Sequence, residues 1–568
     1  METIWEFNPQ FASEYAPNWA EELGLPKVLG KILTQRGITS LAQARDFLYP
    51  KYSNLIDPFV FPEMEKAIIR ICQALKNKER IMVFGDYDVD GISATALLFL
   101  ILSHLGAEVS YYLPQRLTEG YGLSKEGMDE AKRRGVGLII STDCGMTAVE
   151  EANYAKKLGI DLIISDHHLA GDDIPEAYAI INPKYKLEEY PGGELAGVGV
   201  AFKIAQALYR RLGLDESELD EHLDLVALGT AADVVPLTGE NRIFCKFGLE
   251  QIAKSYKLGL KALISLAGLP GKPIGTAQVV FMLAPRLNAV GRLGDAISSI
   301  KLLVTKNEKE AFQIAGFLEA ENSRRRALDE RTQREAEELL QKSGDLSQQK
   351  AIVLSKPDWH PGILGIVAAR LAESHYRPTI LVTFDQEEGK GSARSIPGFD
   401  LFSALKECSH LLERFGGHRQ AAGLSVSPSK FADFKQTFLR VTAERLTGQD
   451  LTPWQQIDAE LEFKDVNNQL LESLELLAPF GPGNMRPVFV SRKVNKADFP
   501  GIVGNNHLKL RVAQAAAEFD AIGFSLGSWA KPIATNSGTI DLAYVLETNT
   551  WNGQTNIQLR IKDLKFSK

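Results

Sequence analysis

The sequence predicts an α/β protein whose first domain is built on a doubly wound parallel sheet. Three short apolar runs, at 81–84, 138–140 and 162–164, lack any alternation of polar and apolar residues. Such runs are typical of parallel strands that are buried on both faces. Stretches of helical character at 93–105 and 148–158 give the strand–helix order of this fold class.

Acidic clusters closely follow each of the three runs: DYDVDG at 86–91, STDCG at 141–145 and SDHH at 165–168. The carboxyl ends of parallel strands line the ligand crevice of such a sheet, so these clusters are expected to converge. A carboxylate-rich set with a few imidazoles suits Mn²⁺ or Mg²⁺, whereas zinc favours more thiolate and imidazole. The pattern predicts a metal-dependent phosphoesterase with a two-ion site.

The first acidic cluster carries three aspartates at alternating positions, Asp86, Asp88 and Asp90. If this stretch is extended, the three side chains share one side of the chain. Without cations they would repel one another. The alternative for Asp86 and Asp88 alone is a loop of solvated carboxylates, but the presence of three such clusters argues against it.

These motifs resemble a known superfamily. GDYDVDG at 85–91, followed by DHH at 166–168, resembles the DHH phosphoesterases. The segments LPQR with EGYGL at 113–123 and APRLNAVGR at 284–292 further resemble the RecJ family of single-strand-specific DNA exonucleases. The resemblance extends from about Phe61 to the C-terminus, and it implies a metal-dependent nuclease.

The resemblance also implies roles for individual residues. It makes Asp88, Asp90, His167 and Asp233 metal ligands, and it makes Asp143 the carboxylate that bridges two ions. The nucleophile is then a metal-bound hydroxide rather than a Ser or Cys side chain.

Two further positions, 168 and 84, lie near the expected metal site. His168 is expected to face the scissile phosphate. Several superfamily members have a histidine where this chain has Phe84, so one metal lacks that ligand. Asp86 is a second-rank candidate to replace it, with water as the alternative.

Length and composition indicate a large protein with several domains, because 568 residues exceed what one hydrophobic core serves. The four cysteines are scattered without zinc-like pairing, which favours reduced thiols and a cytoplasmic location. No membrane segment is expected. Residues 1–52 carry no catalytic candidate and are expected to form a cap on the first domain. The predicted parts are an N-terminal extension (1–60), a DHH catalytic domain (61–304), a helical connector (305–345), a DHHA1 domain (346–450) and an OB-fold domain (451–568).

The net charge of −8 is unusual for a DNA-binding protein, because phosphate contacts come from Lys and Arg. A local basic path is compatible with an acidic average. Arg116 and Arg292 are the leading candidates because they lie in the family-like motifs. Arg286 and the triplet 324–326 are weaker candidates, since a triplet in a helix is equally well explained by surface salt bridges.

Segment 306–342 lacks proline, and its apolar residues recur at helical spacing among many charges. It is expected to form a long helix of about 55 Å that links two domains. A coiled-coil partner helix is the alternative, but no sustained heptad supports it.

A second α/β domain is predicted beyond this helix, with strands at 351–354 and 379–382 around a helix at 365–373. Two glycine-rich segments, GSARS at 391–395 and FGGH at 415–418, offer groups suited to binding a phosphate. Both resemble the DHHA1 domain. That resemblance assigns nucleic-acid phosphate, including the 5′ end, to Ser392, Arg394, Gly417 and His418, and gives a weaker assignment to His360.

The C-terminal region predicts a small antiparallel barrel. Alternating runs at 508–512, 542–546 and 557–561 read as strands, and Asn552-Gly553 predicts a tight hairpin turn. The region, including PFGPGN at 479–484, resembles the OB-fold of RecJ. Trp551 and Phe524 are candidates for base stacking, with Trp551 favoured and Phe524 expected in the barrel core.

The function predicted from all of these features is a metal-dependent, single-stranded-DNA-specific 5′-to-3′ exonuclease of DNA repair and recombination. The family resemblance supplies the direction. The alternatives are a phosphatase or short-oligonucleotide phosphodiesterase of the same superfamily, and a catalytically silent scaffold that binds single strands. The expected partner is single-stranded DNA, with a single-strand-binding protein and a helicase as candidate recruiters and a monomer as the expected state.

Overall fold

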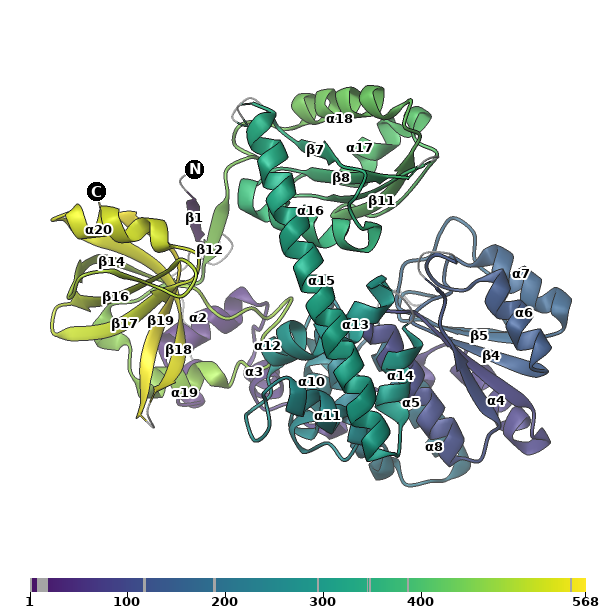
Figure 1. Cartoon of the computed structure of the whole chain (residues 1–568). Helices are drawn as coiled ribbons and strands as arrows, with labels where there is room; N and C mark the ends of the chain where they lie inside the picture. Colours follow the sequence, from purple (N-terminus) through teal and green to yellow (C-terminus); the bar gives the residue numbers. More distant parts are fainter. Residues whose placement is uncertain are drawn as a thin grey trace. The chain divides into compact units, whose positions relative to one another are not determined.

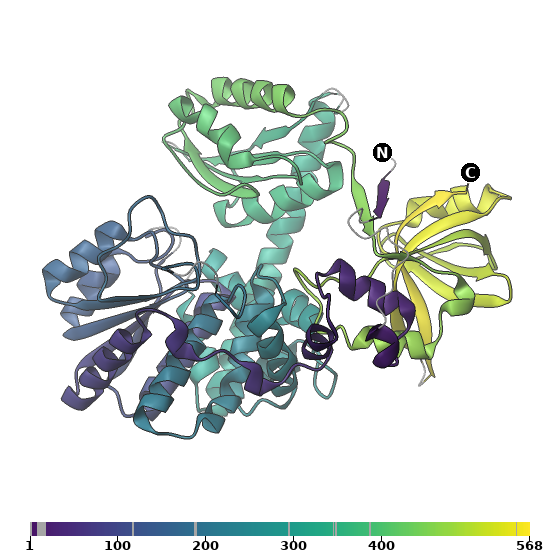
Figure 2. The same ribbon diagram turned by 180° about the vertical axis from the view of Figure 1, so that it is seen from behind.

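The computed structural model describes residues 3–7, 19–115, 119–186, 190–293, 296–344, 346, 349–385, 388–551 and 554–567. The chain divides into two compact units (Figures 1 and 2). One unit comprises Glu6–Leu318 and Gln456–Lys568, and the other comprises Met1–Trp5 and Glu319–Gln455. Among the described residues, every helix is too short or too polar to cross a membrane.

A five-stranded parallel sheet organises the first part of the larger unit, in the order β3-β2-β4-β5-β6. The three strands predicted from sequence are its centre, which confirms the doubly wound parallel sheet. The strand bounds are Arg80–Gly85 (β2), Val109–Tyr112 (β3), Val136–Thr142 (β4), Asp161–Ser165 (β5) and Ala179–Ile181 (β6).

Both faces of this sheet are covered by helices. Ile81 and Val83 pack in the hydrophobic cluster that also contains apolar residues of α4 (Met64–Asn77), α5 (Val89–His104) and α8 (Gly197–Leu212). Met82 and Phe84 pack in a second cluster with residues of α6 (Lys125–Arg133) and α7 (Val149–Leu158). Burial on both sides explains why β2 shows no polar alternation.

Helices complete this region of the unit. Helix α9 (Leu223–Ala232) is buried from Leu223 to Ala231 and leads directly into Asp233. The other helices are α10 (Gly239–Lys254), α11 (Leu258–Leu266), α12 (Thr276–Gln278), α13 (Ala284–Leu293) and α14 (Ile297–Val304), with a π-helical turn, η5, at Val279–Leu283.

The C-terminal barrel has seven strands in the order β13-β14-β18-β19-β17-β16-β15, and β14 also pairs with β16. This confirms the predicted barrel. Trp551 pairs with Gln554 across β18 and β19, as a two-residue hairpin requires, although Asn552 and Gly553 lie outside the described residues. The bounds are Ala459–Glu460 (β13), Phe489–Lys496 (β14), Gly501–Val503 (β15), His507–Gln514 (β16), Ala517–Gly523 (β17), Ile540–Trp551 (β18) and Gln554–Phe566 (β19), with helices α19 (Asn468–Glu475) and α20 (Ala530–Thr535).

The N-terminal helices α1 (Trp19–Glu22), α2 (Lys27–Gln35) and α3 (Leu41–Leu48) pack mainly with the barrel. Their apolar residues, including Leu29 and Leu33, share one hydrophobic cluster with barrel residues such as Phe489 and Tyr544. The expectation of a cap on the first domain is therefore wrong for the apolar face of this segment. The pattern of apolar residues shows that such a face exists, but not which surface covers it.

Helix α15 runs from Glu308 to Lys342, 35 residues, which confirms the predicted long helix. The boundary between the two units falls within it, at Glu319. The arginine triplet lies on this helix, and each member has a carboxylate partner: Arg324 with Glu321, Arg325 with Asp329 and Arg326 with Glu319. These ion pairs support the salt-bridge interpretation of the triplet.

The smaller unit contains a five-stranded mixed sheet in the order β10-β11-β9-β8-β7, in which only β7 and β8 are parallel. The strands are Ile352–Ser355 (β7), Thr379–Phe384 (β8), Gly389–Arg394 (β9), Arg414–Gly417 (β10) and Ala421–Val426 (β11). Helices α16 (Pro361–His375), α17 (Leu401–Glu407) and α18 (Phe431–Arg445) accompany them.

Candidate metal centre and nucleic-acid contacts

The first acidic cluster turns from a strand into a helix. Strand β2 ends at Gly85 and α5 begins at Val89, so Asp88 is the N-cap and accepts a hydrogen bond from the Gly91 N–H at 3.0 Å. Asp90 lies in the first helical turn. The stretch is not extended, and the expectation that its three aspartates share one side of an extended chain is wrong. The helix start favours carboxylates because backbone N–H groups point toward them.

Asp90 is oriented by a second helix start. The N–H groups of Gly197 and Val198, at the start of α8, donate to its two carboxylate oxygens at 2.6 and 2.9 Å. Gly229 of α9 passes so close that a Cβ on it would lie 2.8 Å from Asp90 Oδ1. Sequence reasoning did not select Gly197 or Gly229. The only available signal was a glycine inside an otherwise apolar helical run.

Asp143 directly follows β4 in a strained backbone conformation, with a φ of +61°. Its N–H donates to the Ser165 carbonyl at 2.9 Å. A Cβ on Gly197 would lie 2.6 Å from the Asp143 Cβ, so the start of α8 packs directly against this aspartate.

The predicted ligands converge. Three groups each have ligand atoms within 4.8 Å of one another, and Asp143 belongs to two of them. The His167 Nε2 lies 3.1 Å from Asp143 Oδ1 and 3.8 Å from Asp233 Oδ2. The groups are Asp86–Asp88–Asp143, Asp90–His167–Asp233 and Asp143–His167–His168.

The chemistry of this donor set fits divalent cations. Burial, together with the neighbouring carboxylates, raises the pKa of Asp90 and Asp143 well above the usual range. Within the described chain, His167 Nδ1 and Asp233 Oδ2 are buried without a hydrogen-bond partner. Burial and the nearby His168 lower the pKa of His167, which favours the neutral imidazole that binds metals. A cation would relieve the carboxylate repulsion.

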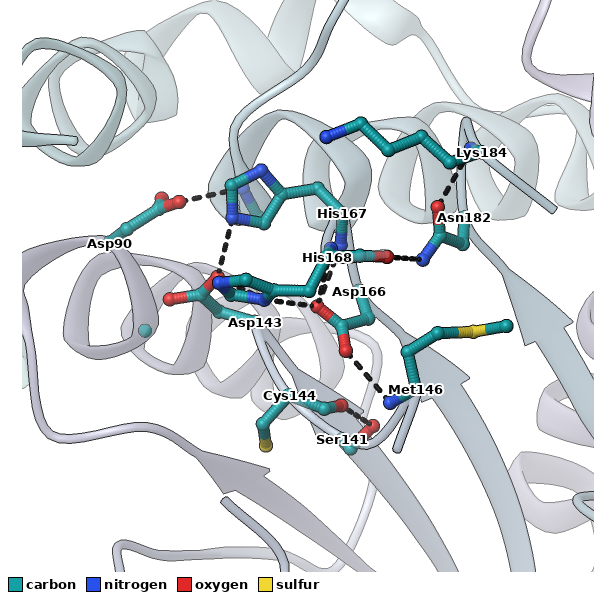
Figure 3. A network of polar contacts seen from close by, with 12 residues as sticks. Asp90, Ser141, Asp143, Cys144, Met146, Asp166, His167, His168, Asn182 and Lys184 are labelled. Carbon is teal, nitrogen blue, oxygen red and sulfur yellow. Dashed lines mark hydrogen bonds and ion pairs between the residues drawn. The ribbon is translucent and has the colours of Figure 1, made fainter. Parts of the chain in front are cut away.

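Asp166 organises the second histidine rather than joining a ligand group (Figure 3). Its Oδ1 accepts hydrogen bonds from the His168 ring Nδ1 at 2.8 Å and from two backbone N–H groups, and its Oδ2 accepts from the Met146 N–H. Burial lowers the pKa of His168, but the Asp166 carboxylate outweighs that effect and raises it. A protonated His168 suits a phosphate better than a metal.

Tyr121 is a neighbour that sequence reasoning named only as part of a motif. Its hydroxyl donates to the Asp143 carbonyl at 3.2 Å and lies 3.4 Å from His168 Nε2. The side chain is 52% exposed, so Tyr121 lies at the open side of the metal-ligand groups.

Phe84 occupies a core position in this chain. Its side chain is fully buried, contacts Tyr112 at a ring distance of 5.0 Å, and would collide with any Cβ at Gly127. Phe84 therefore belongs to the apolar cluster on one face of the sheet. Asp86, two residues later and 1% exposed, is the residue that reaches the metal-ligand groups.

Of the arginines predicted to contact DNA in the larger unit, the structure describes Arg286 and Arg292. Arg292 lies in the last turn of α13, next to Gly291, whose Cβ would lie 3.0 Å from the Tyr87 carbonyl oxygen. Helix α13 therefore reaches the loop of the first acidic cluster. Arg286 donates to the Met282 carbonyl in the preceding π-helical turn η5, and Arg116 lies outside the described residues.

The phosphate-binding candidates of the smaller unit lie on β9 and at the end of β10, two strands that β11 separates in the sheet. Ser392 and Arg394 are on β9, where the guanidinium donates to Ser392 Oγ at 3.2 Å. Gly417 ends β10 with a φ of +140°, and the His418 N–H donates to the Ala421 carbonyl. His360 accepts a hydrogen bond from the Gly362 N–H as the N-cap of α16, a structural role that explains this histidine.

One of the two barrel aromatics, Phe524, differs from the prediction. Phe524 is 53% exposed rather than buried, and it contacts the His507 ring edge-to-face at 5.0 Å. The expectation of a core Phe524 is wrong, because this residue lies just beyond the end of β17. The side chain of Trp551 lies outside the described residues.

Comparison with known proteins adds three domain matches. The chain matches the family models described as the DHH family N-terminal domain at residues 80–230, the DHHA1 domain at 348–444 and the RecJ OB domain at 457–563. The single-stranded-DNA-specific exonuclease RecJ of Bacillus subtilis is 38% identical over 551 residues, which cover 96% of this chain and 69% of that protein. The RecJ of Escherichia coli is 34% identical over 567 residues, which cover 95% of this chain and 96% of the relative.

The chain belongs to the RecJ family. Solved structures of RecJ agree with this assignment. The crystal structure of Thermus thermophilus RecJ in complex with Mn²⁺ covers all of this chain and has 80% of its own length covered, with a TM-score of 0.83 at 30% identity. A RecJ exonuclease bound to manganese matches 69% of this chain with a TM-score of 0.61 at 37% identity.

Proposed function

We propose that this RecJ-family chain is a metal-dependent exonuclease that hydrolyses single-stranded DNA from the 5′ end. The observation that carries the proposal is the convergence of Asp86, Asp88, Asp90, Asp143, His167 and Asp233 at the carboxyl ends of the parallel strands. The RecJ exonucleases that resemble this chain over most of its length support the substrate.

Mn²⁺ or Mg²⁺ is the proposed cofactor. RecJ structures with each of these ions resemble the fold of this chain. The Asp86–Asp88–Asp143 group and the Asp90–His167–Asp233 group would each hold one ion, with Asp143 placed between them. When bound, such paired ions lower the pKa of water and neutralise charge on the attacking and leaving oxygens.

The chain's own residues would perform the remaining tasks. Asp166 holds the His168 ring and favours its protonated form, so His168 would donate a hydrogen bond to a phosphate oxygen. Tyr121, with its hydroxyl next to His168, would limit how a phosphate approaches. The backbone N–H groups at the start of α8 hold Asp90 so that its oxygens need not reorganise during the reaction.

Binding of the strand would use other elements. Arg292 and Arg116 are the proposed contacts of the larger unit, and Ser392, Arg394, Gly417 and His418 are the proposed phosphate contacts of the smaller unit. Trp551 and the barrel would bind bases. In this proposal, sequence-independent backbone contacts and base stacking accept any base sequence.

The proposal includes a wider setting. We expect a monomer that acts in the cytoplasm, in DNA repair and recombination, with a single-strand-binding protein and a helicase as candidate recruiters. The proposed domains of the protein are the N-terminal extension, the catalytic domain, the helical connector, the DHHA1 domain and the barrel, with the boundaries predicted from the sequence.

The test uses 3′-labelled single-stranded DNA with a 5′-phosphate, incubated with Mn²⁺ and either wild type or Asp143→Ala. Progressive shortening from the 5′ end in wild type, absent in the variant, is the expected result. An intact long strand in both samples would overturn the exonuclease. Hydrolysis of dinucleotides under the same conditions would then identify the short-oligonucleotide phosphodiesterase, and tight DNA binding without any hydrolysis would identify the silent scaffold.

A further inference from the structure

The segment after the candidate ligand Asp233 is restrained from outside its own domain. Asp233 is the C-cap of α9, and its neighbour Val234 is 86% exposed, whereas Val235 is 3% exposed and packs in the core cluster of the parallel-sheet domain. A further restraint acts on the next two residues. The Leu237 N–H donates to the Pro482 carbonyl at 2.7 Å, and Asn241 Nδ2 donates to the Pro236 carbonyl at 3.1 Å.

Pro482 belongs to loop 479–484, which precedes the barrel strand β14 and packs tightly against this segment. A Cβ on Gly483 would lie 2.9 Å from the Pro236 Cβ, and a Cβ on Gly481 would lie 2.6 Å from Leu237 Cδ1. Gly483 also has a φ of +68°, a conformation that L side chains rarely adopt. Glycine at these two positions allows the loop to approach the Asp233 segment.

The loop is held from its other side by a buried amide. Asn484 is fully buried, and its Nδ2 donates to the carbonyls of Leu477 and Pro479, each at 2.7 Å. Its Oδ1 accepts a hydrogen bond from Arg36, which also donates to the Met485 carbonyl at 2.6 Å. Arg36 lies at the end of α2, so the N-terminal segment contributes to the shape of the loop.

Arg242 connects the same three segments. It is the residue after Asn241 on α10, is 2% exposed, and donates to the Phe47 carbonyl at 2.7 Å and to the Leu477 carbonyl at 2.8 Å. Its other donors reach the carbonyls of 476 and 478, just after α19. A cation at the last carbonyls of a helix is favourable, and here it joins α10, the N-terminal segment and the chain leading into the barrel.

We propose that loop 479–484 is a positioning element for Asp233, and that Arg36, Arg242 and Asn484 act through it on metal affinity. The inference rests on the proposed role of Asp233 as a ligand. Because Asp233 caps a helix and precedes an exposed residue, the packing of Val235 and the restrained segment at 236–237 together set its orientation. Partners behind metal ligands typically change metal affinity 10–100-fold when they are mutated. The N-terminal segment and the barrel, which is proposed to bind bases, thereby contribute to the metal site.

The test compares two glycine substitutions with the same backbone requirement. Gly483 and Gly213 both have a φ of +68°, but a Cβ at Gly213 meets nothing within 4 Å, whereas a Cβ at Gly483 meets Pro236. Gly483→Ala and Gly213→Ala therefore share the backbone cost and differ in the contact. Mn²⁺ binding to the full-length metal-free proteins would be titrated by the paramagnetic resonance signal of free Mn²⁺, below the measured unfolding temperature of each.

The expected result is that Gly483→Ala weakens one Mn²⁺-binding step by about 10-fold while Gly213→Ala leaves it unchanged. Asp233→Asn should weaken the same step. Equal binding by the two glycine variants, with a step lost in Asp233→Asn, would overturn the positioning role and leave the metal site intact. No change in Asp233→Asn would overturn the ligand assignment itself, and the inference with it.

A milder variant is available in case Gly483→Ala does not fold. The Thr276 Oγ1 donates to the Phe480 carbonyl at 2.6 Å, so Thr276→Val removes one restraint on the loop at nearly constant volume. A smaller loss of affinity in the same binding step supports the proposal. Wild-type affinity in Thr276→Val overturns it.

Discussion

At the scale of single residues, the candidate metal centre is a set of carboxylates held in place by the backbone. Asp90 is fixed by two N–H groups of α8, Asp88 by the N–H of Gly91, and Asp166 by three backbone N–H groups and the His168 ring. These bonds hold negative charges close together in a buried region. Such a site is costly without a cation, so removing one of its charges should stabilise the metal-free protein.

Asp143→Asn should stabilise the metal-free protein. Burial and four neighbouring aspartates raise the pKa of Asp143, so at pH 7 its ionised form disfavours the folded state. Asparagine removes that charge, and we expect the unfolding temperature of the EDTA-treated protein to rise by about 2–4 °C. Differential scanning calorimetry would measure it, with the exposed Asp173→Asn as the control. A lower unfolding temperature than wild type would contradict the account.

Substitutions of the two histidines should distinguish metal binding from catalysis. His167→Gln removes a ligand atom from the Asp90–His167–Asp233 group and should lower Mn²⁺ affinity by about 10-fold or more. His168→Gln should leave Mn²⁺ affinity within about twofold and lower kcat by about 100-fold, the usual effect of losing one positioned donor. Calorimetric Mn²⁺ titration and cleavage kinetics would distinguish them. Equal loss of Mn²⁺ affinity in both variants would make His168 a ligand.

His222 should make stability depend on pH. Burial lowers its pKa from 6.5 to about 3, so below pH 6.5 the unfolded chain binds a proton that the folded chain does not. The contribution to stability is therefore complete above pH 6.5 and is lost as the pH falls toward 3. Between pH 6.5 and 5.5, wild type should lose about 1 kcal/mol more than His222→Gln in urea unfolding. The exposed His410→Gln should lose as much as wild type.

At the scale of elements, helix starts and strand ends meet at the candidate site, and the barrel presents a separate apolar surface. Around β15 and the ends of β16 and β17, Phe499 is 84% exposed, Ile502 59% and Phe524 53%. The β15–β16 pairing and the Phe524–His507 contact place these residues at one edge of the barrel sheet. An exposed aromatic surface on a barrel suits stacking with bases.

Phe524→Ala should therefore weaken single-stranded DNA binding by about 1–3 kcal/mol, the usual contribution of one base stack. Fluorescence anisotropy with an oligothymidylate, in the Asp143→Ala background so that the strand stays intact, would measure the Kd. Tyr256→Ala removes an aromatic side chain that is 81% exposed outside the barrel and should leave the Kd unchanged. An identical Kd for both variants would exclude Phe524 from the binding surface.

At the scale of the whole molecule, all candidate metal ligands lie between Asp86 and Asp233, within one of the two compact units. Metal binding should therefore stabilise that unit selectively. At a Mn²⁺ concentration about 100 times the Kd, the expected stabilisation is about 2.7 kcal/mol. In calorimetry, Mn²⁺ should raise the transition of the unit containing the parallel sheet and leave the other transition in place.

Asp143→Ala provides the control for the metal-dependent transition. The variant lacks the carboxylate shared by two ligand groups, so Mn²⁺ should shift its transition little. A shift as large as that of wild type would mean that Mn²⁺ binds elsewhere on the chain.

Local sequence was sufficient for some of the elements. The three central strands of the parallel sheet, the 35-residue helix and the barrel hairpin have strong local signals, namely apolar runs, proline-free periodicity and an Asn-Gly pair. The site could be predicted from the sequence because Asp and His residues come directly after strand ends. The orientation of Asp90 could not be predicted, since its partners Gly197 and Val198 are more than a hundred residues away in the chain.

The sequence by itself determined the candidate residues for the chemistry: the aspartates and histidines after strand ends, whose types indicate a site for hard cations. Only the tertiary structure decided how these residues divide into groups of candidate metal ligands, with Asp86 and Asp88 in one group and Asp90 in another. It also decided that Phe524 is exposed, and that the loop before β14 packs against the segment that follows Asp233. The physical reason is that residue type and periodicity are local properties, whereas ligand geometry, burial and close backbone approach depend on segments that meet only after folding.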